Sequence, residues 1–303
     1  MASSESAEGI LARHRQAFAS AAGIVQAYYA AAVFIVIGQL DLWDRWRSAR
    51  EIEPLWPLTW ISLTGIELAA WLVLLLALGG NLAAAWRPER RIFRILAFIG
   101  FFEFAAFDNS FGKINHLWHA CVWIGFFLMA LPDGERSWIA RSITRRQLYL
   151  TVVWAAQAVV LIFYSMAGGW KVLMAAVQLW RGQIHAFHPD AFALQILAHW
   201  SKLRSDAPLG PYLIEHSFLG WPLYVAGIYL EFFAFIAIFR PLLHKVWGLG
   251  LILFHMGTHL ILGISFSPNV LLLGLFMIGS PFAPSRQSWR ETLRALPIFG
   301  FLA

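Results

Sequence analysis

Cysteine is almost absent from this 303-residue chain, which contains only Cys121. A single thiol cannot close an internal disulfide, and it cannot supply a thiolate metal cluster within one chain. Cys121 lies in an apolar stretch, where a cysteine behaves as a small hydrophobic side chain. The sequence therefore excludes a disulfide framework and a cysteine-rich metal site.

Charged residues are also scarce, at 13% of the chain, whereas hydrophobic residues make up 59% and the mean hydropathy is +0.63. A soluble domain has about 25% charged residues. The formal net charge of +6 would suggest nucleic acid as a partner of a soluble protein. Here the basic residues lie beside long apolar runs, so membrane topology explains them better and no nucleic-acid partner is expected. The composition predicts an integral membrane protein.

Apolar runs of membrane-spanning length predict an all-α, polytopic helical bundle with about eight transmembrane helices. We expect a cytoplasmic N-terminal segment over 1–16, a single membrane domain over 17–283 and a cytoplasmic tail over 284–303. The sequence shows no internal repeat. The predicted spans are residues 17–40, 58–82, 92–107, 117–131, 148–170, 218–239, 246–264 and 269–280.

The longest predicted connection lies after the fifth span, over residues 171–217. Its middle, from Phe192 to Trp200, has the pattern of an amphipathic helix lying on the membrane. Lys and Arg are more numerous on the side of the membrane that carries both termini, so the positive-inside rule places the termini in the cytoplasm. This loop then faces outward, and the predicted location is the bacterial inner (plasma) membrane.

Lys171 follows the small residues Gly168 and Gly169 at the predicted outer end of the fifth span. One interpretation is a lysine whose ammonium group reaches the head groups. The other is a functional residue, because charged groups near hydrocarbon are costly and rare.

The predicted topology places further ionisable groups at a depth similar to that of Lys171, in several different spans. Such groups must pair with one another or meet water, so their coincidence predicts a polar cavity that opens outward. Trp170 and Trp180 flank the lysine segment and could wall an apolar ring pocket. The residues expected around this cavity are Glu67, Glu103, Asp108, Lys113, His116, His119, His255 and His259.

Two histidine pairs leave a metal site open as an alternative. His255 and His259 are spaced i, i+4 on one helix face, and His116 and His119 are spaced i, i+3. The competing interpretation is that these rings form hydrogen bonds to carboxylates such as Glu103.

Glu231 and Arg240 bracket the inner half of the sixth span, and we interpret both as structural. Glu231 lies at mid-depth and needs a partner, for which Gln157 is a candidate, or a proton. Arg240 precedes Pro241 and fits an anchor at the inner interface.

The order of several short motifs resembles the HTTM (horizontally transferred transmembrane) domain, the membrane part of vitamin K-dependent gamma-carboxylases and of bacterial relatives. The central motif is matched by Tyr164, Ala167, Gly168, Lys171, Trp180 and Gly182. The segment from Glu231 to Arg240, His255 in the next span, and Asn115-His116 at the head of a span resemble other parts of that domain.

This resemblance implies a pocket for a quinol of the vitamin K or menaquinone type, with Lys171 as the base that deprotonates it and His116 as a second catalytic residue. In the carboxylases the oxygenated quinol then becomes a strong base that abstracts a proton from substrate glutamate, to which CO2 adds. Those enzymes also carry a sizeable soluble region after the membrane part, which this chain does not contain. We therefore expect quinol chemistry rather than peptide carboxylation.

Two further functions remain open. The chain could be a non-catalytic subunit or scaffold of a respiratory, photosynthetic or transport complex, with other membrane subunits and the lipid bilayer as its partners. It could also be a histidine-metal oxygenase that uses His116, His119, His255 and His259 as ligands.

Overall fold

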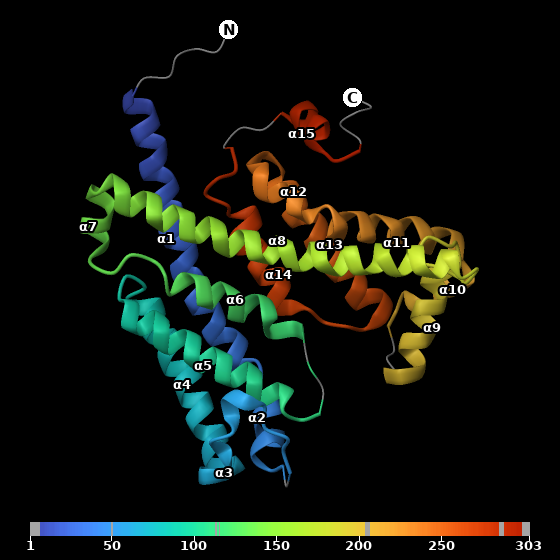
Figure 1. The fold of residues 1–303 in the computed structure, drawn as a ribbon, viewed down its shortest axis with the longest axis horizontal. Helices are drawn as coiled ribbons and strands as arrows, with labels where there is room; N and C mark the ends of the chain where they lie inside the picture. Colours follow the sequence, from blue (N-terminus) through green and yellow to red (C-terminus); the bar gives the residue numbers. More distant parts are fainter. Residues whose placement is uncertain are drawn as a thin grey trace. The chain divides into compact units, whose positions relative to one another are not determined.

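A computed structural model describes residues 7–49, 51–112, 114, 116–203, 207–284 and 288–298. The protein is 79% helical, and no strand occurs among these residues, which confirms the predicted all-α class. The chain forms two compact units, Met1–Val159 and Val160–Ala303, and the boundary falls inside helix α8, Ile143–Trp180 (Figure 1).

Four helices in the described part of the chain are long and apolar enough to cross a membrane, which indicates an integral membrane protein. Each exceeds the roughly 20 residues that a helix needs to cross about 30 Å of hydrocarbon. They cover Glu8–Ile37, Ile66–Trp86, Ile143–Trp180 and Pro241–Leu262, and two shorter apolar helical segments cover His116–Leu128 and Ser267–Ile278. The prediction of about eight spans is therefore supported for four of them.

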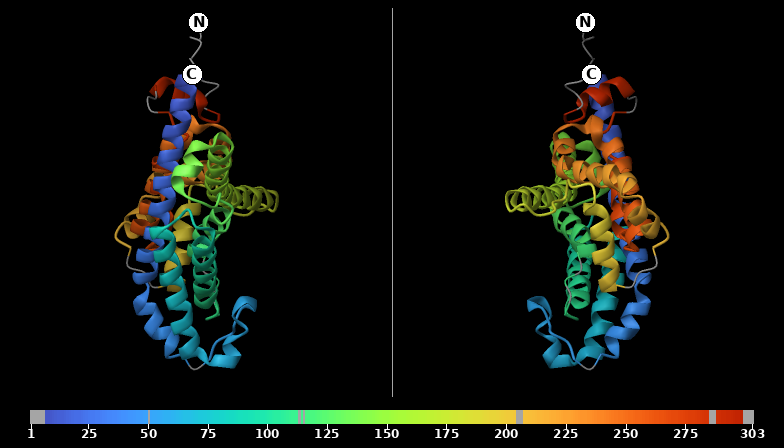
Figure 2. Two further views of the ribbon diagram at one scale, coloured as in Figure 1. Left: turned by 90° about the vertical axis from the view of Figure 1, so that its left-hand side faces the viewer. Right: turned by 90° about the vertical axis from the view of Figure 1, so that its right-hand side faces the viewer.

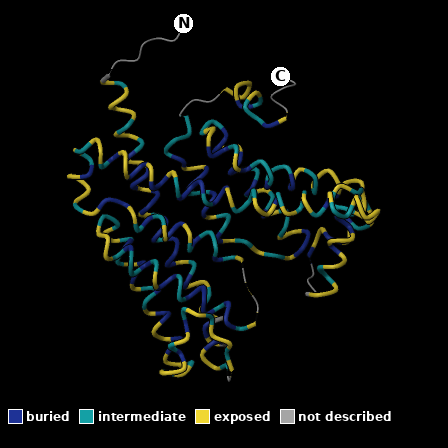
Figure 3. Tube along the Cα trace, in the orientation of Figure 1, coloured by how far each residue is buried: buried dark blue, intermediate teal, exposed yellow. Residues whose placement is uncertain are grey.

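In the first unit, α1 (Ala7–Ile37) and α5 (Arg91–Asn109) both pack on α4 (Ile66–Trp86). Small residues let α4 and α5 cross closely, since a Cβ added to Gly80 would lie 2.7 Å from the backbone of Leu96. Buried residues line all three helices (Figure 3). The other elements of this unit are α2 (Leu40–Arg47), α3 (Ile61–Thr64), α6 (His119–Leu128), α7 (Arg136–Arg141) and the 3-10 turns Trp56–Leu58 and His116–Trp118.

The second unit contains the later part of α8 and the helices after it, which Figure 2 shows from two further sides. Here α13 packs on α11 and on the segment after α14. The elements are α9 (Ala191–Leu203), α10 (Gly210–Glu215), α11 (Ser217–Phe232), α12 (Ala234–Phe239), the 3-10 turn Pro241–Leu243, α13 (His244–Leu262), α14 (Ser267–Leu273), the π-helical turn Gly274–Ile278 and α15 (Trp289–Ala295).

Helix α8 corrects the predicted end of the fifth span. The helix has 38 residues and continues through Gly168 and Gly169 to Trp180, so Lys171 lies inside a helix rather than at its end. At about 1.5 Å per residue its length is about 57 Å. The residues after Lys171 are mostly good helix formers, and a helical glycine costs only about 1 kcal/mol, so nothing local forces a break. The predicted loop over 171–217 is accordingly shorter, and α9 occupies the place of the expected amphipathic helix.

The predicted sixth span is interrupted. Helix α11 ends at Phe232, and α12 begins at Ala234. The backbone N–H of Phe235 donates to Oγ of Ser165 on α8 at 2.7 Å. A side chain of α8 therefore satisfies one of the backbone donors that the start of a new helix leaves free.

Candidate functional site

Lys171 on α8 and Glu231 on α11 form an ion pair, in which Nζ of the lysine donates to Oε2 of the glutamate. The side chain of Glu231 is 6% exposed and that of Lys171 is 29% exposed. Burial weakens the competition from water, so such a pair interacts more strongly than a surface pair. This pair is the centre of the candidate site.

Gly168 explains why the two side chains meet. A Cβ on this residue would lie 2.3 Å from the backbone nitrogen of Phe232, so any other residue would force α8 and α11 apart. Lys171 lies about one turn after Gly168, and Glu231 directly precedes Phe232. The close helix crossing therefore places the ammonium group beside the carboxylate.

Tyr164 extends the site along the same face of α8, because it lies seven residues, or about two turns, before Lys171. Its hydroxyl forms a hydrogen bond of 2.5 Å with Nε2 of His255 on α13. His255 is buried, and in the described part of the chain its Nδ1 has no hydrogen-bond partner. If the tyrosine hydroxyl donates to Nε2, the imidazole proton lies on Nδ1 and is a buried donor without an acceptor.

Aromatic rings surround these polar groups. Nζ of Lys171 lies 5.7 Å from the ring centroid of Phe254, within cation–π range. The ring of Phe266 lies 5.0 Å from that of His255. The site therefore combines an ion pair, a tyrosine–histidine pair and apolar walls.

Six of the predicted site residues belong to the first unit, where two of them are acidic residues held by tryptophans. Glu103 accepts a hydrogen bond from Nε1 of Trp60 at 3.2 Å. Asp108 accepts one from Nε1 of Trp118 at 2.6 Å. Both carboxylates thus have local roles in holding α5 against neighbouring segments.

His116 and His119 pack against each other in that unit, with ring centroids 4.9 Å apart. The side chain of Glu67 is exposed, and Lys113 and Asn115 lie outside the described residues. A functional role for these residues therefore stays a prediction.

Three other predicted residues are in the second unit and are exposed. Trp170 and Trp180 have exposed fractions of 63% and 89%, so within this unit their indoles do not enclose Lys171. His259 is also exposed on α13, one turn after His255. Of the predicted set, the structure brings Lys171 and His255 together.

No group of three or more His, Cys, Asp or Glu side chains in the described residues could hold a metal ion. The pair His255 and His259 does not converge, because His255 faces Tyr164 while His259 is exposed. The metal alternative gains no support from this geometry.

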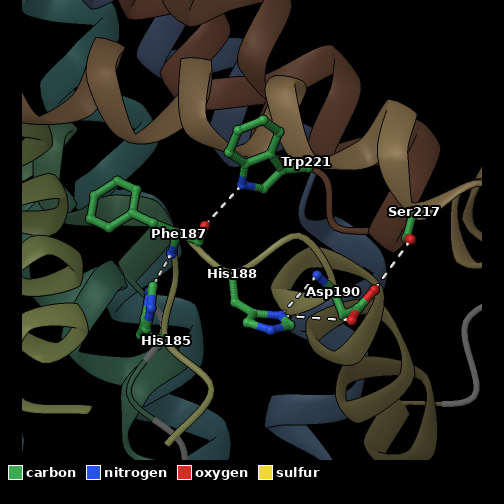
Figure 4. Close-up of polar contacts among 6 residues, drawn as sticks. All are labelled: His185, Phe187, His188, Asp190, Ser217 and Trp221. Carbon is green, nitrogen blue, oxygen red and sulfur yellow. Dashed lines mark hydrogen bonds and ion pairs between the residues drawn. The ribbon is translucent and has the colours of Figure 1, made fainter. Parts of the chain in front are cut away.

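The histidines of the loop after α8 fasten that loop to itself, and the carbonyl oxygen of Phe187 joins it to α11 (Figure 4). The backbone N–H of Phe187 donates to Nδ1 of His185, and Nε1 of Trp221 donates to the carbonyl oxygen of Phe187 at 3.0 Å. Nδ1 of His188 accepts the backbone N–H of Asp190 at 3.2 Å and lies 3.7 Å from its carboxylate. The contact with the backbone N–H is the shorter of the two, so we interpret His188 as a residue that stabilises the turn rather than as half of an ion pair.

Glu231 is the site residue that sequence reasoning assigned to a structural role with Gln157 as its candidate partner. The structure gives it Lys171 as a partner. A signal was present, because a carboxylate at mid-depth in one span and a lysine in another are each expected to be paired. What the sequence lacked was the rotation of each helix about its axis.

Comparison with family models, with curated proteins and with solved structures finds no match to this chain.

Proposed function

We propose that this chain is a membrane protein of the HTTM type that binds a quinol, or a similar lipid-soluble aromatic, beside Lys171 and removes a proton from it. The single observation that carries the proposal is the buried ion pair between Lys171 and Glu231. Charged groups inside a membrane protein are costly and concentrate at functional sites.

Lys171 can accept a proton only as a neutral amine. Glu231 provides a route to that form, because the ammonium proton can move to the carboxylate along their hydrogen bond. Both products are neutral, so a weakly polar surrounding favours them relative to water. In this proposal Glu231 stores the proton and the amine of Lys171 is the base.

The residues present fit an aromatic ring with hydroxyl or carbonyl oxygens. Nδ1 of His255 is buried, has no partner among the described residues, and could bind one such oxygen. Phe254 and Phe266 offer ring faces beside the two polar groups. A bound quinol supplies an acidic hydroxyl, and the chain supplies its acceptor and its orientation. His116 remains a proposed second catalytic residue.

The test measures quinone in the purified protein. The full chain, in mild detergent, is incubated with menaquinone, washed and extracted, and the bound quinone is quantified by mass spectrometry. We expect near-stoichiometric quinone in the unchanged protein and in Lys202→Ala, whose lysine is exposed on α9. Lys171→Ala should lose most of it. Equal retention in Lys171→Ala would contradict the proposal.

A specific observation also favours a second function. The ion pair and the Tyr164–His255 hydrogen bond satisfy most of these polar groups locally, as expected of a non-catalytic subunit of a larger membrane complex. Fixed partner chains after gentle purification, with no bound quinone, would favour this alternative. A histidine-metal oxygenase would instead retain stoichiometric iron or another transition metal.

We further propose that the chain lies in a bacterial inner membrane with both termini in the cytoplasm. The supporting observation is the distribution of Lys and Arg around the apolar segments. Cysteines introduced singly at Ala12 and Ser288 of a Cys121→Ser chain, and labelled in intact cells, test this topology. Both should stay unlabelled by a reagent that cannot cross the membrane.

A further inference from the structure

The first unit contains a second polar feature that the proposed function does not use. It is a cavity of about 630 Å³ between α1, α7 and the start of α8. Pockets that hold small ligands have volumes of about 300–1,000 Å³. The lining residues are Arg15, Phe18, Ala19, Arg136, Ser137, Ala140, Arg141 and Arg146.

The charge of this cavity is of one sign. Four of its eight lining residues are arginines, and none is acidic. In the part of the chain that the structure describes, none of these guanidinium groups forms an ion pair with a carboxylate. The nearest acidic residues in sequence are Asp133 and Glu135, and Asp133 already accepts the backbone N–H of Arg91 at 2.9 Å. Like charges around one hollow repel, so an anion bound there would be stabilised.

Arg146 is the buried arginine among the residues that line the cavity. Its side chain is buried, its Nε donates to Nδ1 of His14 at 3.2 Å, and its Nη1 donates to the carbonyl oxygen of Ala140. The same guanidinium therefore ties α1, α7 and α8 together. Arg15, Arg136 and Arg141 are exposed and keep their donors available.

The position of the cavity along the helices relates it to the membrane surface. Arg15 lies near the beginning of α1 and Arg146 in the first turn of α8, and both helices are candidate spans. The cavity therefore lies near the start of two candidate spans, where we expect the lipid head groups. Phe18 and Ala19 line it one turn further along α1, on the side of the apolar part of the span.

We propose that this cavity binds the phosphate group of an anionic ligand, and that the ligand is the head group of an acidic phospholipid. Guanidinium groups bind phosphate oxygens through paired hydrogen bonds. Basic pockets between membrane helices on the cytoplasmic side are typical sites for such head groups. The volume leaves room for a glycerol phosphate, and Phe18 offers an apolar contact to the first part of the acyl chains.

The test compares matched pairs of charges in the full chain. Thermal unfolding is followed by tryptophan fluorescence in neutral detergent with dioleoyl-phosphatidylglycerol, dioleoyl-phosphatidylcholine or glycerol 3-phosphate. We expect phosphatidylglycerol to raise the melting temperature more than phosphatidylcholine. Arg15→Gln/Arg141→Gln should bind phosphatidylglycerol about tenfold or more weakly. Arg90→Gln/Arg91→Gln, which removes two exposed charges at the start of α5, should bind it as the unchanged protein does.

Each part of this experiment distinguishes the proposed site from one other explanation. Arg146 is left intact, because its loss would disturb folding, and melting without lipid reports whether each variant is folded. An equal effect of glycerol 3-phosphate, lost in the Arg15/Arg141 variant, would support the phosphate site but give it a soluble ligand. Equal weakening in both double variants, or no preference for phosphatidylglycerol, would overturn the proposal, since general surface charge would then suffice.

Discussion

Lys171 and Glu231, 60 positions apart in the chain, form an ion pair in which the glutamate side chain is 6% exposed. The pair joins α8 to α11 at the point where Gly168 lets the two backbones approach. An ion pair with so little water has two roles that mutation can separate. It holds the helices together, and in the proposed function it takes a proton from a bound ligand.

Removing one member of the pair should cost more than removing both. Lys171→Met or Glu231→Gln alone should lower the free energy of unfolding by about 2–4 kcal/mol, because the remaining partner stays buried without a counter-charge. The double variant should be closer in stability to the unchanged protein than the sum of the single effects. Denaturant unfolding in detergent and a double-mutant cycle measure this coupling.

The surface pair between Arg47 and Asp44 provides the control for this cycle. Its side chains are 42% and 64% exposed, so Asp44→Asn should change stability by less than about 1 kcal/mol. Additive effects of Lys171→Met and Glu231→Gln would show that the buried pair contributes no coupling.

The two adjacent glycines of α8 should respond in opposite directions to alanine. Gly168→Ala places a methyl group against the backbone of Phe232 and should destabilise the protein by about 1–3 kcal/mol. Gly169 has nothing within 4 Å of an added Cβ, so Gly169→Ala should stabilise the helix by about 0.5–1 kcal/mol. Melting temperatures of the two variants, measured side by side, check the prediction; equal shifts would contradict it.

The helical fold could be predicted from the sequence, but some helix ends could not. Hydropathy places the apolar runs of α1, α4 and α13 well, because partition into lipid depends on composition alone. It misplaced the end of α8, since the residues after Lys171 are less apolar yet favour helix, and backbone hydrogen bonds continue where hydropathy falls. The break after Phe232 depends on Ser165 of another helix, which no local pattern reveals.

The candidate site could be predicted only in part from the sequence, for a related reason. Sequence position gives the depth of a residue along a span but not the direction that its side chain faces. Lys171 and His255 were expected around one cavity; in the structure Lys171 pairs with Glu231, and His255 forms a hydrogen bond with Tyr164. Glu231 was given a structural role. Its contact with Lys171 depends on the close helix crossing that Gly168 permits, and hydropathy does not reveal that crossing.

Asp133 should make stability dependent on pH at the acidic end. The backbone N–H of Arg91 donates to its carboxylate, and this hydrogen bond, with the charges of Arg94 and Arg90, lowers the pKa of Asp133. A carboxyl group with a lowered pKa in the folded state stabilises the protein above its ordinary pKa, and that stabilisation is lost as the pH falls through the lowered value. The loss should therefore occur below about pH 4.

Melting temperatures between about pH 6 and pH 3 test this effect in the unchanged protein and in Asp133→Asn. The variant should be less stable near neutral pH and should lose less stability on acidification. Because Asp133 is exposed, the difference should be small and should shrink at high salt. Parallel curves for the two proteins would show that Asp133 does not contribute to the pH dependence of stability.

The hydrogen bond between Tyr164 and His255 should stabilise the second unit even without a ligand. Tyr164→Phe leaves Nε2 of His255 without its partner, on a ring whose Nδ1 has none in the described part of the chain, and should cost about 1–3 kcal/mol of unfolding free energy. Tyr212→Phe is the matched control, since Tyr212 is exposed and should change stability by less than about 0.5 kcal/mol. In Tyr164→Phe/His255→Leu no polar atom of the pair remains, so part of the loss should be recovered. A double variant less stable than Tyr164→Phe would mean that His255 is held by its aromatic neighbours rather than by the tyrosine hydroxyl.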